Sequence, residues 1–244
     1  MSHQIIIKPS DHIINVRSNE TILQAALREG LSLPYGCRNG SCGACKGKIT
    51  QGTVDFGQHD EDTLTEKEKQ NGMALFCCAS PLSDLVIECQ EINTIKDIEI
   101  KTLPCRVQKL ELVAPDVIVL SLKLPPSQRL QFLAGQYIDI LLKDGKRRSF
   151  SLANAPHDDE CLQLHCRNYT GGVFAEHVFT QMKEKDLLRF EGPFGSFFLR
   201  DTPNDAPIIF VASGTGFAPI KSMLEHAFSK QANSQVKRKM TLYW

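Results

Sequence analysis

The sequence predicts three consecutive structural units: a small α+β unit over residues 1–92, an antiparallel β-barrel over 103–202, and an incomplete α/β unit with a parallel sheet over 204–244. Three observations lead to this division. At 244 residues the chain is longer than one compact core usually needs. The apolar pattern changes twice, from mixed strands and helix to many short strands, and then to an apolar run followed by a helix. A charged stretch poor in large aromatic residues, 93–102, has the composition of a linker.

In the first unit, β-branched runs at 5–8 and 13–17 flank a Pro-Ser-Asp turn and predict a hairpin. Asn19 is expected to cap a helix over 20–29 that stops at Gly30. The other elements expected in this unit are a strand over 48–50, a short helix that starts at the capping-box pattern Thr65-Glu66-Lys67-Glu68, and a closing strand over 85–91.

The later units differ in their hydrophobic periodicity. Short strands separated by turn clusters predict the barrel, at 106–113, 117–124, 136–142, 149–153 and 162–169, with one helix over 173–182. An apolar run at 208–212, a glycine turn, helical spacing over 217–229 and a second apolar run at 240–244 then predict a β-α-β arrangement with parallel strands.

Composition excludes several functional classes. The 28 Lys and Arg residues balance 28 Asp and Glu residues, which leaves no basic field for nucleic acid or an anionic membrane. No apolar run is long enough to span a bilayer, and the first nine residues lack the pattern of a signal peptide. We therefore expect a cytoplasmic protein with neither a nucleic-acid nor a membrane partner.

The nine cysteines are unevenly distributed, which indicates metal or redox chemistry. Cys37, Cys42 and Cys45 follow the spacing C-x4-C-x2-C, and a fourth cysteine lies 32 positions further on, at Cys77. This spacing is typical of plant-type [2Fe–2S] proteins, in which four thiolates bind two irons. Glycines in the same loop allow the backbone to curl closely around a cluster.

Two alternatives to a [2Fe–2S] cluster are a zinc site and a loop of free thiols. Structural zinc sites usually have two paired-ligand knuckles, whereas this loop has a single C-x2-C pair and a lone Cys37. Cys78 competes with its neighbour for the place of fourth ligand. The four remaining cysteines show no ligand spacing and are expected to have packing roles: Cys89, Cys105, Cys161 and Cys166.

Three phrases carry a resemblance to a known family: LPYGCRNG at 33–40, ALFCCA at 74–79 and RSFSLANAP at 148–156. Residues 1–92 resemble a plant-type ferredoxin domain of the β-grasp fold. The whole chain resembles bacterial iron–sulfur flavoprotein reductases of the ferredoxin–NADP reductase superfamily, most of all the CDP-6-deoxy-Δ3,4-glucoseen reductase type. The resemblance implies the domain order ferredoxin, FAD-binding barrel and NAD(P)-binding domain, and it favours Cys77 as the fourth cluster ligand.

The resemblance also implies flavin-binding residues. Arg148, Ser149, Phe150 and Ser151 match the superfamily's Arg-x-(Tyr/Phe)-Ser motif, and a phrase similar to the family's Phe-x-Pro-Gly-Gln-Tyr precedes them at 132–137. Arg148 is expected to bind the flavin pyrophosphate, Phe150 to offer an aromatic face to the ring, and Ser151 to hydrogen-bond its N5 edge. Without the family context, an arginine beside a strand is usually a solvated edge.

Two further segments are implied in the flavin site. Gly172 and Val173 begin a helix whose N–H groups can hold a phosphate, although the family's hydroxyl residue is replaced by Ala175. His165 and Arg167 lie on the preceding strand, where the family also lines its flavin pocket. A plain strand without a binding role is an equally good interpretation of these two residues.

The last unit has the context of a dinucleotide-binding turn. Gly214, Thr215 and Gly216 follow an apolar strand and open a helix, and Pro219 stands where the Rossmann fingerprint has its third glycine, as in this superfamily. A nicotinamide domain of this type resembles a five-stranded parallel sheet, whereas 208–244 holds only β-α-β. We therefore expect a truncated Rossmann-like domain that is either part of a longer protein or no longer functional.

These observations predict an NAD(P)H-dependent oxidoreductase. Electrons would pass from NAD(P)H through FAD to a [2Fe–2S] cluster and on to a partner protein, which the resemblance implies is a dehydrase or an oxygenase. No acid–base catalytic residue is required, because the cofactors supply the chemistry. The alternatives are an electron-transfer module with flavin and cluster but without NAD(P)H oxidation, and a zinc-stabilised structural protein.

Overall fold

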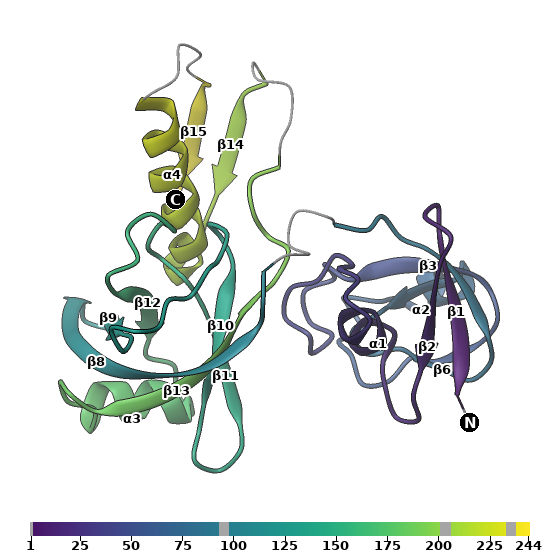
Figure 1. The fold of residues 1–244 in the computed structure, drawn as a ribbon, viewed down its shortest axis with the longest axis horizontal. Helices are drawn as coiled ribbons and strands as arrows, with labels where there is room; N and C mark the ends of the chain where they lie inside the picture. Colours follow the sequence, from purple (N-terminus) through teal and green to yellow (C-terminus); the bar gives the residue numbers. More distant parts are fainter. Residues whose placement is uncertain (1, 93–97, 201–205, 233–237) are drawn as a thin grey trace. The chain divides into compact units, whose positions relative to one another are not determined.

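The structure, a computed structural model, describes residues 2–92, 98–200, 206–232 and 238–244. The chain forms two compact units, Met1–Asp97 and Ile98–Trp244 (Figure 1). The elements predicted over 204–244 are part of the second unit. Half of the predicted linker, residues 93–97, lies outside the described residues. No helix among the described residues is both long and apolar enough to cross a membrane.

The first unit is built on a five-stranded sheet with the order β2-β1-β7-β3-β5. Its strands are β1 His3–Lys8, β2 His12–Val16, β3 Lys46–Gln51, β5 Met73–Leu75 and β7 Leu85–Glu88. β1 pairs with β2 as the predicted hairpin, and it pairs in parallel with β7, where Ile5 lies opposite Leu85. A separate small sheet joins β4 Val54–Asp55 to β6 Ser80–Pro81. Alternate residues of β1 and β7 are fully buried and form the core of this unit.

Two short helices accompany this sheet. Helix α1 spans Ile22–Arg28, and its N-cap is Thr21, which forms a capping box with Gln24. The prediction that Asn19 caps this helix is therefore wrong: Asn19 has a φ of +65° and lies in the turn before it. The predicted stop at Gly30 is confirmed by its φ of +76° and by its N–H donating to the carbonyl of Leu27. Helix α2 spans Glu66–Gln70 and has the predicted Thr65–Glu68 capping box.

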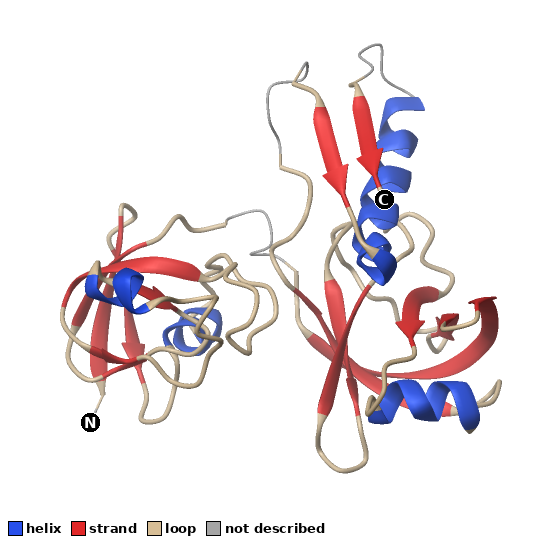
Figure 2. Cartoon of the chain, turned by 180° about the vertical axis from the view of Figure 1, so that it is seen from behind, coloured by secondary structure: helices blue, strands red, loops and turns tan. Residues whose placement is uncertain are grey.

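The second unit contains a six-stranded antiparallel sheet with the order β11-β10-β13-β8-β9-β12 (Figure 2). Its strands are β8 Lys101–Ala114, β9 Val117–Lys123, β10 Tyr137–Leu141, β11 Arg147–Ser151, β12 Leu162–Arg167 and β13 Leu187–Phe194. The predicted closed barrel is not formed. The edge strands β11 and β12 meet through a single isolated bridge, Leu152 to Leu164, because β11 ends at Ser151 and only one residue of its continuation is in register with β12.

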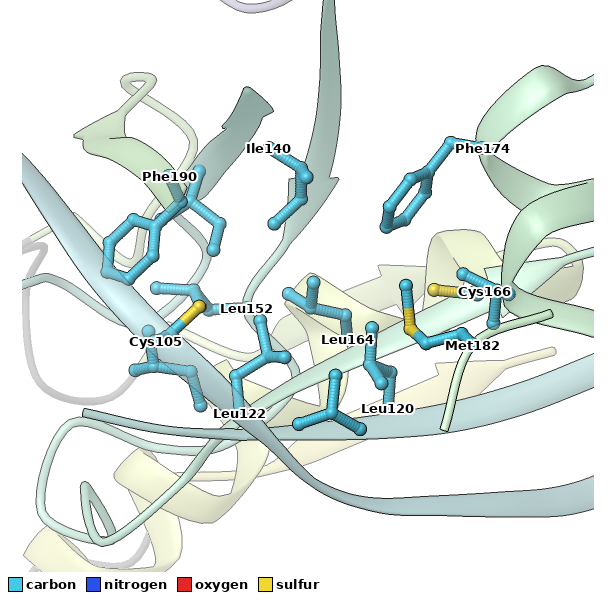
Figure 3. Close-up of a cluster of buried hydrophobic side chains, with 14 of the residues drawn as sticks. Cys105, Leu120, Leu122, Ile140, Leu152, Leu164, Cys166, Phe174, Met182 and Phe190 are labelled. Atoms are coloured by element: carbon cyan, nitrogen blue, oxygen red, sulfur yellow. The ribbon is translucent and has the colours of Figure 1, made fainter. Parts of the chain in front are cut away.

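The inner face of this sheet carries a large hydrophobic core (Figure 3). The spacing of the buried residues follows the pleat, as in β12, where Leu162, Leu164 and Cys166 are buried and the residues between them are not. Helix α3, Val173–Thr180, covers one end of this core and buries Phe174 and Val178 in it. The thiols of Cys105 and Cys166 are part of this core, which agrees with their expected packing roles.

The end of the second unit is a β-α-β segment (Figure 1). Strands β14 Ile208–Val211 and β15 Met240–Tyr243 are parallel, and α4 Phe217–Ala232 connects them. A smaller core lies between this segment and the sheet, and it joins Phe210, Ile220 and Met223 to Ala134, which precedes β10. The β-α-β segment is thus packed against the antiparallel sheet through apolar side chains.

Candidate functional site

The cysteine loop lies between α1 and β3 and contains no regular secondary structure between residues 31 and 45. Cys45 directly precedes β3, and Cys77 follows β5 by two residues. These strands pair antiparallel with Lys46 opposite Leu75, and the N–H of Phe76 donates to the carbonyl of Cys45 at 3.1 Å. The register of one strand pair thus brings together the two cysteines that are separated by 32 positions.

The Cys37 thiol interacts with that of Cys42 and the Cys45 thiol with that of Cys77, and Cys77 also contacts Cys78. The N–H of Cys37 donates to Sγ of Cys42 at 3.3 Å, and the two thiols are also hydrogen-bonded. Cys45 donates to Cys77, which lowers the pKa of Cys77 to about 6 and raises that of Cys45. Burial alone would raise the pKa of Cys37, but the N–H of Asn39 and the Cys42 thiol lower it to about 7. One thiol of each pair is therefore poised as a thiolate, the form that binds iron.

The four predicted ligand cysteines differ in their exposure to solvent. Cys45 and Cys77 are buried, Cys37 is half-buried and Cys42 is exposed. A cluster held by these four sulfurs would have one protected side and one side near solvent, as exchange with a protein partner requires. Among the described residues, no three or more His, Cys, Asp or Glu side chains form a group that could hold a single metal ion. The fit to a two-iron cluster rests on the two thiol pairs.

Glycines make room for the loop. Gly40 has a φ of +83°, and a Cβ there would lie 2.8 Å from Cα of His59 and 3.0 Å from Sγ of Cys78. A Cβ on Gly36 would lie 3.0 Å from Sγ of Cys42. Residues 57–64 cover the loop, with the N–H of Asp60 donating to the carbonyl of Gly40 at 3.3 Å. The hydroxyl of Thr63 also donates to the carbonyl of Ser41 at 3.1 Å. Nothing in the sequence pattern pointed to this covering segment.

Cys78 lies beside the four predicted ligands. Its Sγ is 3.5 Å from that of Cys77. Burial first, and then the neighbouring Cys77, raises the pKa of Cys78 to about 12. Cys78 is therefore the more protonated of the two adjacent thiols, which favours Cys77 as the ligand.

The flavin motif on β11 is divided between the two faces of the sheet. Arg148 and Phe150 lie opposite Ile140 and Ile138, which are fully buried on the core side. The ring of Phe150 packs on that of Phe174 in α3, with 5.3 Å between the centroids. The Nη1 of Arg148 donates to the carbonyl of Arg147 at 2.8 Å. The core side of β11 therefore carries Arg148 and Phe150, and the start of α3 lies on that side as well.

Ser149 and Ser151 belong to the other face. The hydroxyl of Ser149 donates to Oδ1 of Asp139 at 2.6 Å, and Asp139 is buried. Arg147, on the same face, pairs with Glu191 and lies 3.9 Å from Asp139. Ser149 thus helps to satisfy a buried carboxylate, a contact that the sequence motif did not predict. Ser151 lies opposite Tyr137.

Helix α3 begins at the predicted glycine pair. Gly172 is its N-cap and supplies no side-chain cap, so the first N–H groups of the helix, from Val173 onward, have no side-chain partner from this residue. Ala175 is buried against the core and leaves the helix start without the family's hydroxyl. This helix start has the electrostatic character of a phosphate site.

His165 and Arg167 lie on the face of β12 opposite the core. The ring of His165 is 6.5 Å from that of Phe217, the first residue of α4. Nε of Arg167 donates to Oδ2 of Asp116 at 2.6 Å, and its Nη1 would be 3.2 Å from a Cβ on Gly214. The structure therefore places these two residues beside the glycine turn.

The glycine turn is a single 3-10 turn, Gly214–Gly216, that leads directly into α4. Gly214 has a φ of +51°. Nε1 of Trp244 donates to the carbonyl of Gly214 at 3.1 Å, and the Trp244 ring stacks on Phe217 at 4.2 Å. Pro219 lies in the first turn of α4, where its missing N–H costs no helical hydrogen bond. Sequence patterns gave no sign of the Trp244 contact.

Comparison with known proteins identifies two domain families in the chain. Residues 5–82 match the family described as "2Fe-2S iron-sulfur cluster binding domain", and residues 104–199 match "Oxidoreductase FAD-binding domain". Over 244 residues the chain is 40% identical to "CDP-6-deoxy-L-threo-D-glycero-4-hexulose-3-dehydrase reductase" of Yersinia pseudotuberculosis serotype I (strain IP32953), with 100% of this chain and 71% of that protein covered.

The names of one further relative and of one similar solved structure refer to a dioxygenase and to a cytochrome P450. "Terephthalate 1,2-dioxygenase, reductase component 2" of Comamonas sp is 40% identical over 247 residues, with 100% of this chain and 70% of that protein covered. The crystal structure of an Amycolatopsis cytochrome P450 reductase, GcoB, superposes with a TM-score of 0.77 at 30% identity, and covers 99% of this chain and 71% of that one.

Proposed function

Because this chain belongs to the iron–sulfur flavoprotein reductases, the family that joins a 2Fe-2S cluster binding domain to an oxidoreductase FAD-binding domain, we propose that it carries electrons from NAD(P)H to a partner protein. Electrons enter at FAD, continue to the [2Fe–2S] cluster and leave to an acceptor. Nicotinamide supplies electrons in pairs as hydride, and the flavin and cluster allow them to leave singly. The chain's residues bind and orient these groups.

The observation that carries this proposal is the pairing of thiols from two distant segments. Cys37 and Cys42 come from the loop, and the β3–β5 register places Cys77 against Cys45. A loop of unrelated free thiols would not need this register or the glycine at position 40. We assign Cys37, Cys42, Cys45 and Cys77 as the cluster ligands.

In the FAD-binding part, we assign Arg148 to the flavin pyrophosphate, together with the N–H groups at Gly172 and Val173. A guanidinium fork and a helix start are the two groups best suited to bind phosphate oxygens. Phe150 is half-buried against Phe174, so its ring is held in place while part of it stays accessible. Ser151 is assigned to the N5 edge of the flavin ring and Ser149 to the same cofactor site. Both serines lie on the face of β11 opposite Phe150, where Ser149 is also bound to Asp139.

The β14-α4-β15 segment is proposed to belong to a Rossmann-like nicotinamide domain. Its support is the parallel strand pair and the glycine turn that opens α4. Gly214, Thr215, Gly216 and Pro219 would bind the dinucleotide phosphates. His165 and Arg167 stay proposed as residues of the flavin pocket, and they lie on β12 beside this turn. The FAD-binding part is an open antiparallel sheet in place of the predicted barrel, and its two edge strands meet at one bridge.

The physiological acceptor is proposed to be a dehydrase or an oxygenase component. This choice is supported by the names of two relatives, one a reductase of a hexulose dehydrase and one a reductase component of a dioxygenase. A cytoplasmic location stays a prediction from the sequence.

The test is an anaerobic titration of the purified protein with NADH and with NADPH, after iron, sulfide and flavin have been quantified. Bleaching of the flavin absorbance followed by reduction of the cluster is the expected result. A protein that contains both cofactors, is reduced by dithionite and is not bleached by either dinucleotide would instead be an electron-transfer module without a hydride step. Zinc in place of iron would contradict the redox function altogether.

A further inference from the structure

Three consecutive residues of α4 contact the antiparallel sheet. Nζ of Lys221 donates to the carbonyl of Ala153 at 3.2 Å. Oγ of Ser222 donates to the carbonyl of Asn154 at 2.7 Å. Met223 packs in the small core with Ala134. Neither Lys221 nor Ser222 was singled out by any sequence motif, because the carbonyls that they bind lie 68 positions away in the chain. Lys221 also contacts Oε1 of Gln163 and pairs with Glu225 on the same helix.

The two accepting carbonyls belong to the segment that continues the flavin motif. Ala153 and Asn154 follow Ser151 by two and three residues, and both are fully buried. The N–H of Ala153 donates to the carbonyl of Gln163 at 2.8 Å, which holds the segment to β12. The hydrogen bond to β12 and the burial of the segment therefore fix the orientation of the Ala153 and Asn154 carbonyls.

Asn154 is fixed on both sides by its own side chain. Its Nδ2 donates to the carbonyl of Asp158 at 2.7 Å, and its Oδ1 accepts from the N–H of Gln163 at 2.9 Å. The bond from Ser222 is itself fully buried, since both residues have no exposed surface. Breaking it would leave a buried carbonyl without its hydroxyl donor, which is costly in a site that water does not reach.

The side chain of Met223, the next residue of α4, closely approaches Gly135 in the segment before β10. A Cβ on Gly135 would lie 2.2 Å from Cε of Met223 and 2.2 Å from the carbonyl oxygen of Phe197, and Gly135 has a φ of +105°. Position 135 is thus restricted to glycine by its φ and by the backbone carbonyl of Phe197, and the end of the Met223 side chain packs against it. The helix is held between the segment after β11 and the segment before β10.

We propose that Ser222, supported by Lys221, is a positioning residue that sets the distance between the nicotinamide turn and the flavin motif. Helix α4 starts at the glycine turn, so its docking fixes Gly214–Gly216 relative to Ser151 by way of Ala153 and Asn154. Ser222 does not contact either cofactor site. It acts on hydride transfer through the placement of the helix, and displacements of about 1 Å can slow such steps by up to about 100-fold. This inference rests on the proposed function.

The test compares Ser222→Ala with Ser229→Ala, an exposed serine on the same helix. In Ser222→Ala we expect faster hydrogen exchange at residues 153–163 and in the first turns of α4. We also expect the rate of flavin reduction at saturating NAD(P)H to fall roughly tenfold, with flavin content and reduction by dithionite unchanged. Ser229→Ala should match the unmodified protein, and Ser222→Thr, which keeps the hydroxyl, should restore most of the rate.

Two results would overturn the positioning role: hydrogen exchange in Ser222→Ala that equals that of the unmodified protein, or losses of flavin content and reduction rate in the same proportion. If Ser222→Ala does not fold, Lys221→Met provides the second measurement, since it removes the bonds to the Ala153 carbonyl and to Oε1 of Gln163. If the unmodified protein is not reduced by either dinucleotide, the hydride step of the proposed function is contradicted, and hydrogen exchange alone decides the role of Ser222 in docking.

Discussion

The Sγ atoms of Cys77 and Cys78 lie 3.5 Å apart, and their pKa values are shifted in opposite directions. Hydrogen bonding from Cys45 favours the thiolate at Cys77, whereas burial disfavours it at Cys78. The two neighbours therefore have different chemistry although they are adjacent in sequence.

We expect Cys77→Ser to lose the cluster and Cys78→Ser to keep it. A serine at position 77 removes the partner of Cys45, while a serine at position 78 leaves the Cys45–Cys77 and Cys37–Cys42 contacts in place. Iron and sulfide per chain, with the electron paramagnetic resonance spectrum of the reduced protein, measure the difference. A full cluster in Cys77→Ser and none in Cys78→Ser would reverse the ligand assignment.

Gly40→Ala is expected to lower cluster occupancy more than Gly43→Ala does. Both glycines have a positive φ, of +83° and +72°, so the backbone strain of an alanine is similar at the two positions. They differ in space, because a Cβ at 40 would lie 2.8 Å from the Cα of His59, whereas one at 43 would make an ordinary van der Waals contact of 3.5 Å with the methyl group of Thr63. Iron content measures the cluster occupancy of the two variants, and the melting temperature measures their stability. Equal losses in the two variants would mean that backbone conformation alone decides.

Arg148→Met should weaken flavin binding by at least about tenfold, whereas Arg147→Met should leave it nearly unchanged. A hydrogen bond to a charged group contributes roughly 1.5–3 kcal/mol. Arg147 is a matched neighbour on the opposite face, where it pairs with Glu191. Flavin fluorescence during titration of the flavin-free protein gives the dissociation constants. Weaker binding in Arg147→Met alone would place the flavin phosphates on the other face of β11.

Cys105 and Cys166 should resist alkylation in the folded protein at pH 8. Burial raises the pKa of each thiol to about 12, so only about one molecule in ten thousand carries the reactive thiolate at that pH. Unfolding should make both thiols react at ordinary rates. Because the folded pKa is higher, labelling of the folded protein should still rise with pH above 9, where that of the unfolded chain levels off. Peptide mass spectrometry after iodoacetamide treatment measures this, and rapid labelling of native Cys105 would contradict its burial.

Much of the fold followed from local sequence signals. The turn after β1, the stop at Gly30 and the Thr65 capping box are set by the chemistry of adjacent residues, and the structure confirms them. The cap of α1 was misassigned because Asn19 and Thr21 are both good N-caps, and the choice depends on Gln24, which completes a capping box only with Thr21.

Long-range features could not be read from the sequence. Strand periodicity predicted the antiparallel sheet but not whether its edges close, since that depends on a register between β11 and β12 that is set by the whole sheet. The faces of the flavin motif follow from the alternation of β11, yet the binding of Ser149 to Asp139 requires knowing that β10 is its neighbour. The bonds of Lys221 and Ser222 to the segment after β11 go to the backbone carbonyls of Ala153 and Asn154, which carry no side-chain signature.

The parallel pairing of β1 with β7 has a consequence for biosynthesis. Ile5 has its partner Leu85 almost at the other end of the same unit, so the central strand pair cannot form until nearly all of that unit has left the ribosome. All four predicted iron ligands emerge earlier than Leu85. Loop closure over this span is slow compared with local helix formation. During translation the thiols are therefore open to oxidation or to the wrong metal, and iron supply should matter most while the chain is being made.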